Sequence, residues 1–190
     1  MYRVHGTIEG IADLLFNRPG EIVEEIEDSP KPKAASRQTL EEKRQLAVKD
    51  KLHRDGGGNI IIPPSALLEA LFAGANRAGL KDGKRSLSGT LEAICFIEGT
   101  LLVNGGTDKP DYVHECWGRI PPRTGGMVVL CRPAFHPGWT AAFTMMVADD
   151  RIPQRDVRSS LDHAGLLVGI GAWRPQLGRF KVTAWDVAKL

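Results

Sequence analysis

The chain has 190 residues, of which 42% are hydrophobic and 25% are charged, and its formal net charge is +2 at pH 7. This balance is typical of a folded domain and excludes a chain that is disordered throughout. The small net charge also excludes a histone-like protein, so a nucleic-acid ligand would require basic groups gathered on one surface. The apolar stretches are too short to span a bilayer, and we expect no membrane partner.

Cysteine usage indicates the redox setting of the protein. Cys95, Cys116 and Cys131 cannot all pair within the chain, and none forms a C-x-x-C motif. That pattern argues against a secreted disulfide scaffold and favours a reducing, cytoplasmic location. The amino terminus lacks an apolar run behind a basic start, so we expect no signal peptide.

The first predicted element is a strand over residues 1–9, where polar and apolar side chains alternate. Residues 21–58 differ in composition, with nine acidic and eight basic residues. Within them, residues 39–52 predict a helix, with Thr39 and Glu42 spaced as a capping box and an apolar face too thin for a core helix. We interpret residues 21–58 as a projecting insertion, the alternative being a solvated loop without function.

The middle of the chain predicts one helix between a short strand and a strongly apolar segment. Residues 60–62 predict a short buried strand, and residues 63–78 predict an amphipathic helix that starts at two prolines. Residues 81–85 form a polar, basic loop. Residues 87–103 are strongly apolar, and we favour a short helix or turn followed by strands.

The second half of the chain predicts three strands, a helix and a final strand. The strands cover residues 112–120, 127–131 and 139–147, and prolines and glycines punctuate them. An amphipathic helix follows over residues 153–168, with a proline suited to its first position. After a glycine-bearing loop, residues 179–185 alternate again and predict the last strand.

Reduced to its essentials, the predicted order is strand, helix, strand, strand, helix, strand. That order is the split β-α-β arrangement of ferredoxin-like and RRM-like folds, an α+β architecture with an antiparallel sheet backed by two helices. We expect residues 1–190 to form a single domain, with the insertion between the first strand and the first helix of the sheet.

Enzyme motifs are incomplete. Residues 79–84 have three residues between their glycines, where a phosphate-binding loop needs four, and residues 169–174 end in arginine where a dinucleotide-binding loop needs glycine. His114, Cys116 and Cys131 lack the second close pair of a structural zinc site, and none of the five histidines has an identifiable catalytic partner. We therefore expect no enzymatic activity, no cofactor and no metal.

The basic residues are more informative. Between Glu115 and Asp149 the chain has no acidic residue but contains Arg119, Arg123 and Arg132. Such a stretch is typical of a surface that follows phosphates.

The loop before the last strand combines glycines with arginines. Arg174 and Arg179 flank it, so backbone N–H groups and guanidinium groups could together meet a phosphate. Trp173 precedes Arg174, and Trp117 lies near Arg119. Aromatic rings interleaved with bases suit single-stranded nucleic acid. The alternative is that both tryptophans are core residues and the arginines are solvated.

Residues 168–180 resemble the glycine-rich loop of the RAMP superfamily, the ferredoxin-like proteins of CRISPR effector complexes. Residues 62–71 resemble the proline-led start of the superfamily's first helix. The whole chain resembles short phage proteins related to the backbone subunit of those complexes. These share an opening strand ending in a Leu-Leu turn, a charged insertion and a closing Gly-x-Gly-x-x-Arg-Pro.

The resemblance implies binding to RNA or single-stranded DNA, with protomers stacked along the strand as a homo-oligomer or within a larger ribonucleoprotein. The insertion would then act as a thumb, and a phage-encoded chain would work in the host cytoplasm. The chain is short for a full backbone subunit, and no cleavage aspartate can be identified. The candidate nucleic-acid-binding residues are Lys84, Arg85, Arg119, Arg123, Arg132, Gly169, Gly171, Trp173, Arg174, Gly178 and Arg179.

Two other functions stay open at this point. One is a metal-independent ribonuclease of the RAMP type that uses a histidine. The other is a phage protein-interaction or inhibitor protein that imitates an effector subunit and binds no nucleic acid. The expectation is a non-enzymatic, single-stranded nucleic-acid-binding protein that assembles along its ligand.

Overall fold

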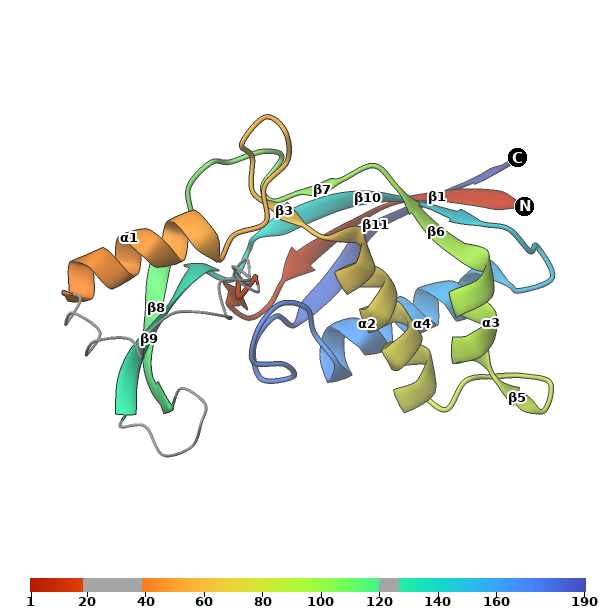
Figure 1. The fold of residues 1–190 in the computed structure, drawn as a ribbon. Coiled ribbons are helices and arrows are strands. Elements are labelled where there is room, and N and C mark those ends of the chain that lie inside the picture. The colour runs from red at the N-terminus through yellow and green to blue at the C-terminus, as the bar shows by residue number, and fades with distance from the viewer. Residues whose placement is uncertain (19–38, 120–126) are drawn as a thin grey trace, which may run out of the picture.

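The computed structural model describes residues 1–18, 39–119 and 127–190 (Figure 1). The candidate Arg123 and the first part of the predicted insertion lie outside these residues, and so does the side chain of Arg119. In the described part of the chain, no helix is both long enough and apolar enough to cross a membrane.

The central sheet has four antiparallel strands in the order β11-β1-β10-β6. They are β1 (Tyr2–Gly10), β6 (Cys95–Glu98), β10 (Thr140–Val147) and β11 (Phe180–Lys189). Two helices, α2 (Pro64–Arg77) and α4 (Gln154–Leu167), lie side by side on one face of this sheet (Figure 1). The predicted ferredoxin-like arrangement is confirmed.

Alternation of side chains along β1 decides which face of the sheet is buried. Tyr2, Val4 and Ile8 are buried toward the helices, while Arg3, His5 and Thr7 are more exposed. Helices α2 and α4 approach closely because Gly74 has no side chain. A Cβ at Gly74 would lie 2.3 Å from the carbonyl oxygen of Ser160. The core therefore sits between one sheet face and this helix pair.

The ambiguous segment 87–103 resolves as predicted, into a short helix followed by strands. Helix α3 (Leu87–Ile94) leads into β6, and β7 (Leu101–Leu102) follows and pairs with β3 (Ile61–Ile62). Strand β6 is thus the second strand of the ferredoxin-like order. Another two-stranded hairpin, β4 (Lys81–Asp82) and β5 (Arg85–Ser86), lies beside α3.

A second, three-stranded sheet stands apart from the first, in the order β2-β9-β8. It consists of β2 (Leu14–Leu15), β8 (Tyr112–Arg119) and β9 (Met127–Phe135). The predicted strands near residues 112–120 and 127–131 therefore form a separate hairpin and do not join the central sheet. Figure 1 shows this hairpin at the opposite end of the molecule from α3.

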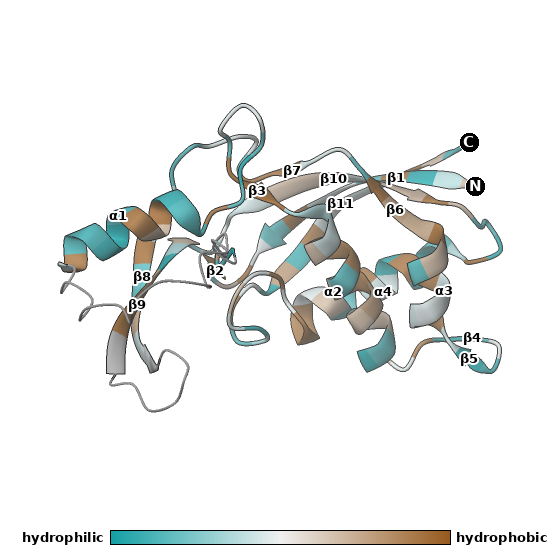
Figure 2. Cartoon of the chain, in the orientation of Figure 1, coloured by the Kyte–Doolittle hydropathy of each residue, from teal (hydrophilic) through white to brown (hydrophobic). Residues whose placement is uncertain are grey.

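The described part of the insertion, residues 39–58, contains the helix α1 (Leu40–Asp50), which begins with the predicted capping box. The amide of Glu42 donates to the Thr39 hydroxyl at 3.2 Å, and the amide of Thr39 donates to the Glu42 carboxylate at 2.7 Å. Figure 2 shows α1 as largely hydrophilic, and Ala47 is its buried residue. The helix packs on β9 and β8, so it covers one face of the hairpin.

Candidate nucleic-acid interface

The glycine-rich loop between α4 and β11 is fastened to β2 by backbone hydrogen bonds. The amide of Ala172 donates to the carbonyl of Leu15 at 2.8 Å, and that of Gly178 donates to the carbonyl of Asp13 at 2.8 Å. Within the loop, the amide of Ile170 donates to the carbonyl of Gly178 at 2.9 Å. These three N–H groups are thus engaged within the protein, and for the remaining amides of the loop a contact with phosphate stays a prediction.

The glycines of this loop allow close packing of the backbone. Gly178 has φ +72°, and a Cβ there would lie 1.7 Å from the carbonyl oxygen of Ile170. A Cβ at Gly171 would lie 2.6 Å from the carbonyl oxygen of Leu15. Gly169 is also buried, with φ +73°. These close backbone contacts hold the loop, and with it the exposed side chains that it carries, in place.

Trp173 is the most prominent of those side chains. It is 42% exposed and has a left-handed backbone with φ 61°, which few residues with side chains adopt. The Arg132 guanidinium carbon lies 4.8 Å from the centroid of the Trp173 ring, within cation–π range. The His114 ring meets Trp173 edge-on at a centroid distance of 5.2 Å. The structure thus brings together two predicted residues, Arg132 and Trp173.

The β8–β9 pairing explains why Arg132 and His114 meet the same ring. His114 is directly opposite Arg132 in the antiparallel register, so the two side chains share one face of the hairpin. Tyr112 lies two residues before His114 and shares that face. Its ring stacks on His136 at a centroid distance of 4.5 Å. We call Tyr112, His114, Arg132, His136 and Trp173 the hairpin–loop surface.

Tyr112 is held at its place by a carboxylate. Its hydroxyl donates to Oδ2 of Asp13 at 2.8 Å. Burial, together with this hydrogen bond, raises the pKa of Tyr112 to about 12. His136 remains exposed beyond the stacked tyrosine. Tyr112 and His136 were not predicted as site residues, because their proximity depends on strand pairing rather than on sequence spacing.

A second cation approaches Arg132 from α1. The ammonium of Lys51, at the end of that helix, donates to the carbonyl of Cys131 at 2.9 Å. Burial lowers the pKa of Lys51, and the positive charge of Arg132 lowers it further. Lys51 thus lies on the α1 side of the hairpin, and Arg132 supplies the positive charge beside Trp173.

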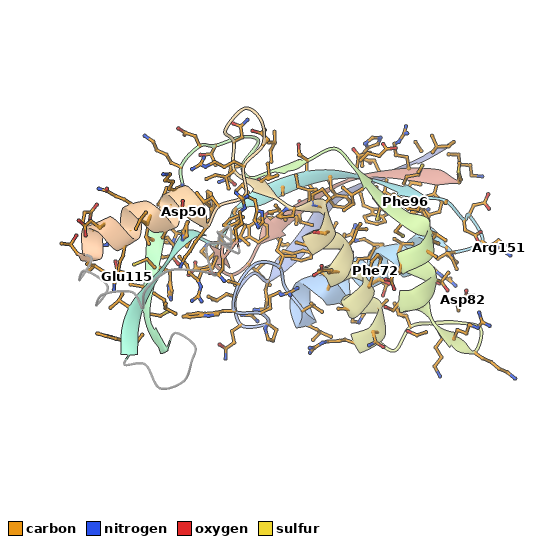
Figure 3. All side chains as sticks on the ribbon, in the orientation of Figure 1. Asp50, Phe72, Asp82, Phe96, Glu115 and Arg151 are labelled. Atoms are coloured by element: carbon orange, nitrogen blue, oxygen red, sulfur yellow. The ribbon has the colours of Figure 1, made fainter. Side chains whose placement is uncertain are left out.

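The opposite face of the hairpin holds Trp117 and Glu115. Trp117 is 68% exposed, and Glu115 forms an ion pair with Arg44 of α1 (Figure 3). The alternative that Trp117 and Trp173 are core residues is therefore wrong.

The other predicted residues are spread more widely. Lys84 and Arg85 are exposed in the β4–β5 region, at the end of the molecule marked by Asp82 in Figure 3 and far from Glu115. They do not join the hairpin–loop surface. Arg174 and Arg179 are exposed, and the carbonyl of Arg179 accepts the amide of Ile11 at 2.9 Å.

Arg174 also lines a pocket of about 590 Å³ beside the loop. Its walls come from β2, β3, the first turns of α2 and the glycine-rich loop, and we call it the β2–α2 pocket. His53 contributes to it, and burial lowers the pKa of that imidazole, with a further decrease from the charge of Arg18. The lining residues are Leu14, Phe16, Asn17, His53, Ile62, Pro63, Ser65, Ala66, Glu69, Gly171, Ala172 and Arg174.

The three residues that the sequence analysis considered as a zinc site, His114, Cys116 and Cys131, do not share one face of the hairpin. Glu115 is directly opposite Cys131, so Cys131 belongs to the α1 side of the hairpin, whereas His114 and Cys116 lie on the Trp173 side. Among the residues that the structure describes, no group of three His, Cys, Asp or Glu side chains is placed to hold a metal ion.

Comparisons with known proteins find similarity in structure and not in sequence. No protein-family model matches the chain. No curated protein sequence matches it either. A chain of the type III-B Cmr-beta complex bound to cognate target RNA, determined by cryo-electron microscopy, shares its fold. The TM-score is 0.60 at 12% identity, and the match covers 99% of this chain and 61% of that chain.

The match to the Cmr-beta complex establishes a shared fold, and this chain spans about three fifths of the length of that relative. A second structure, the Cas6 product complex, matches at 12% identity over 94% of this chain and 50% of that chain. Its TM-score of 0.31 is too low to support an argument. Membership in the RAMP superfamily, and in its phage-type branch, stays a prediction.

Proposed function

We propose that this protein is a non-enzymatic, single-stranded nucleic-acid-binding subunit that assembles along its ligand in the manner of a CRISPR effector backbone. The observation that carries the proposal is the hairpin–loop surface, where Arg132 lies over the exposed ring of Trp173. Bases stack on such rings, and phosphates follow the neighbouring cations. The shared fold supports the proposal, because the Cmr-beta relative is bound to target RNA.

The hairpin–loop surface suits a single strand better than a duplex. His136 and Trp173 are exposed, and stacking on their rings requires bases that are free of a partner. The cations beside them include Arg132 and, in the adjoining loop, Arg174. Binding of this kind is driven largely by phosphate contacts and weakens as salt rises.

The proposal is tested by fluorescence anisotropy with labelled single-stranded RNA and DNA at low and high salt, with light scattering on the same samples. Salt-dependent binding accompanied by particle growth would support it. Absence of binding at low salt would remove it and would favour a protein partner. Co-purification from an extract with and without nuclease treatment would then identify a partner that does not depend on nucleic acid.

The non-enzymatic part of the proposal has its own test. Under the proposal, labelled RNA incubated with the protein in EDTA should remain intact over long times. Cleavage in EDTA that a single His53→Gln substitution abolishes would instead establish a metal-independent ribonuclease.

A further inference from the structure

The β2–α2 pocket adjoins the hairpin–loop surface, because Arg174 lines the pocket and the preceding residue, Trp173, belongs to that surface. When one base of a bound nucleic acid stacks on Trp173, a neighbouring nucleotide is therefore within reach of the pocket. At about 590 Å³, the pocket falls in the range that binds small organic ligands.

The walls of the pocket suit a flat ring with polar edges. Leu14, Phe16 and Ile62 are buried residues that supply an apolar lining, and Pro63 adds to it. The glycine-rich loop closes one side, because Gly171 has no side chain to separate it from Leu15. A nucleobase has two apolar faces and an edge of hydrogen-bonding groups, which matches this arrangement.

The polar groups in the pocket do not form a simple anion site. Arg174 supplies a cation, but Glu69 on α2 supplies a carboxylate that repels phosphate. The lowered pKa of His53 leaves that imidazole neutral near pH 7, with one N–H donor and one acceptor nitrogen. The pocket thus combines a cation that attracts phosphate, Arg174, with two groups that accept hydrogen bonds from N–H donors, Glu69 and His53.

Glu69 narrows the choice of base. A carboxylate accepts two parallel hydrogen bonds, and among the common bases guanine alone presents two adjacent donors, N1–H and the N2 amine, on its Watson–Crick edge. We propose that the β2–α2 pocket receives a guanine base of the bound single strand, with Glu69 accepting from that edge and Arg174 meeting the attached phosphate. This inference rests on the proposed function and adds a base preference to it.

The test compares uridine-rich RNA oligomers that carry one central guanosine, inosine or adenosine, by competition anisotropy at constant salt. Inosine lacks the N2 amine and so removes one of the two hydrogen bonds. The wild type should bind the guanosine oligomer roughly tenfold more tightly than the inosine oligomer. The Glu69→Gln variant should lose that preference while keeping its affinity for the inosine oligomer.

The matched control is Glu92→Gln, which alters another exposed glutamate on α3, outside the pocket. It should keep the full preference for guanosine. Equal binding of all three oligomers by the wild type would overturn the base pocket while leaving nucleic-acid binding intact. Failure of every oligomer to bind would remove the proposed function itself.

A free guanine nucleotide offers the same chemistry as a base within a strand, and GMP is used to separate the two sources. Under the proposal, GMP competes only weakly, because it lacks the contacts along the hairpin–loop surface. Two results together would overturn the proposal that the guanine belongs to a bound strand. These are saturable GMP binding that Glu69→Gln abolishes, and equal binding of the guanosine, inosine and adenosine oligomers.

Discussion

The guanidinium of Arg132 lies over the ring of Trp173, with its central carbon 4.8 Å from the ring centroid. This contact joins the β8–β9 hairpin to the glycine-rich loop, two segments that are distant in the sequence. A cation and an exposed aromatic ring therefore lie together on the surface, and this combination binds unpaired bases and their phosphates.

Removal of the Trp173 ring should weaken binding to single strands. We expect Trp173→Ala to reduce the binding free energy by about 1–3 kcal/mol, the usual value of one stacked base, and Trp173→Phe to retain part of it. Anisotropy with a labelled oligomer measures the change. Phe96→Ala is the matched control, because Phe96 is a similarly exposed ring on β6, far from the loop (Figure 3). Equal losses in both variants would contradict the assignment.

Arg174 and Arg179 should account for part of the salt dependence. Each phosphate contact on a single strand contributes about 0.7 to the slope of log affinity against log salt. The double variant Arg174→Ala/Arg179→Ala should therefore have a slope about 1.4 units shallower, with weaker binding at low salt. Lys84→Ala/Arg85→Ala changes two bases at the other end of the molecule and should alter the slope less. An unchanged slope in the loop variant would rule out these phosphate contacts.

Gly178 should be intolerant of a side chain. In Gly178→Ala the new Cβ would meet the carbonyl of Ile170, so we expect the free energy of unfolding to fall by about 2–3 kcal/mol. Gly79→Ala is the control, since Gly79 has a similar φ of +66° with nothing within 4 Å of the added atom. Its cost should be only about 1 kcal/mol. Urea unfolding of both variants measures the difference, and equal costs would contradict the packing role.

His53 should make stability depend on pH in the acid range. Burial lowers its pKa in the folded state below the ordinary value of 6.5, so the unfolded chain binds more protons there. The free energy of unfolding should therefore decrease as pH falls below 6.5. The His53→Gln variant should lose less stability between pH 7.5 and 5 than the wild type, as measured by urea unfolding. Parallel decreases in the two proteins would show that His53 is not responsible.

Much of the fold could be predicted because its strands and helices are amphipathic. β1 and β10 alternate in the sequence, and α2 and α4 have apolar faces at helical spacing, so their types and order were correct. The second strand of the sheet was harder to place. β6 is four residues long and lies in a continuous apolar stretch, where no period distinguishes a strand from a helix.

The candidate site could be predicted only in part. Trp173 and Arg132 were recognised as aromatic and basic residues near glycines and other arginines, but their contact depends on how the hairpin docks against the loop. Tyr112 and His136 were missed for the same reason. The engagement of the loop amides by β2 was also not predictable, since it arises from the tertiary position of Leu15 and Asp13.

The most direct test of the central claim is ultraviolet crosslinking of single-stranded RNA to the protein, followed by mass spectrometry of the crosslinked peptides. We predict crosslinks to Trp173, Tyr112 and the histidines of the hairpin–loop surface. Crosslinks confined to the uncovered face of the central sheet, where His5 and Thr144 lie side by side, would contradict the account.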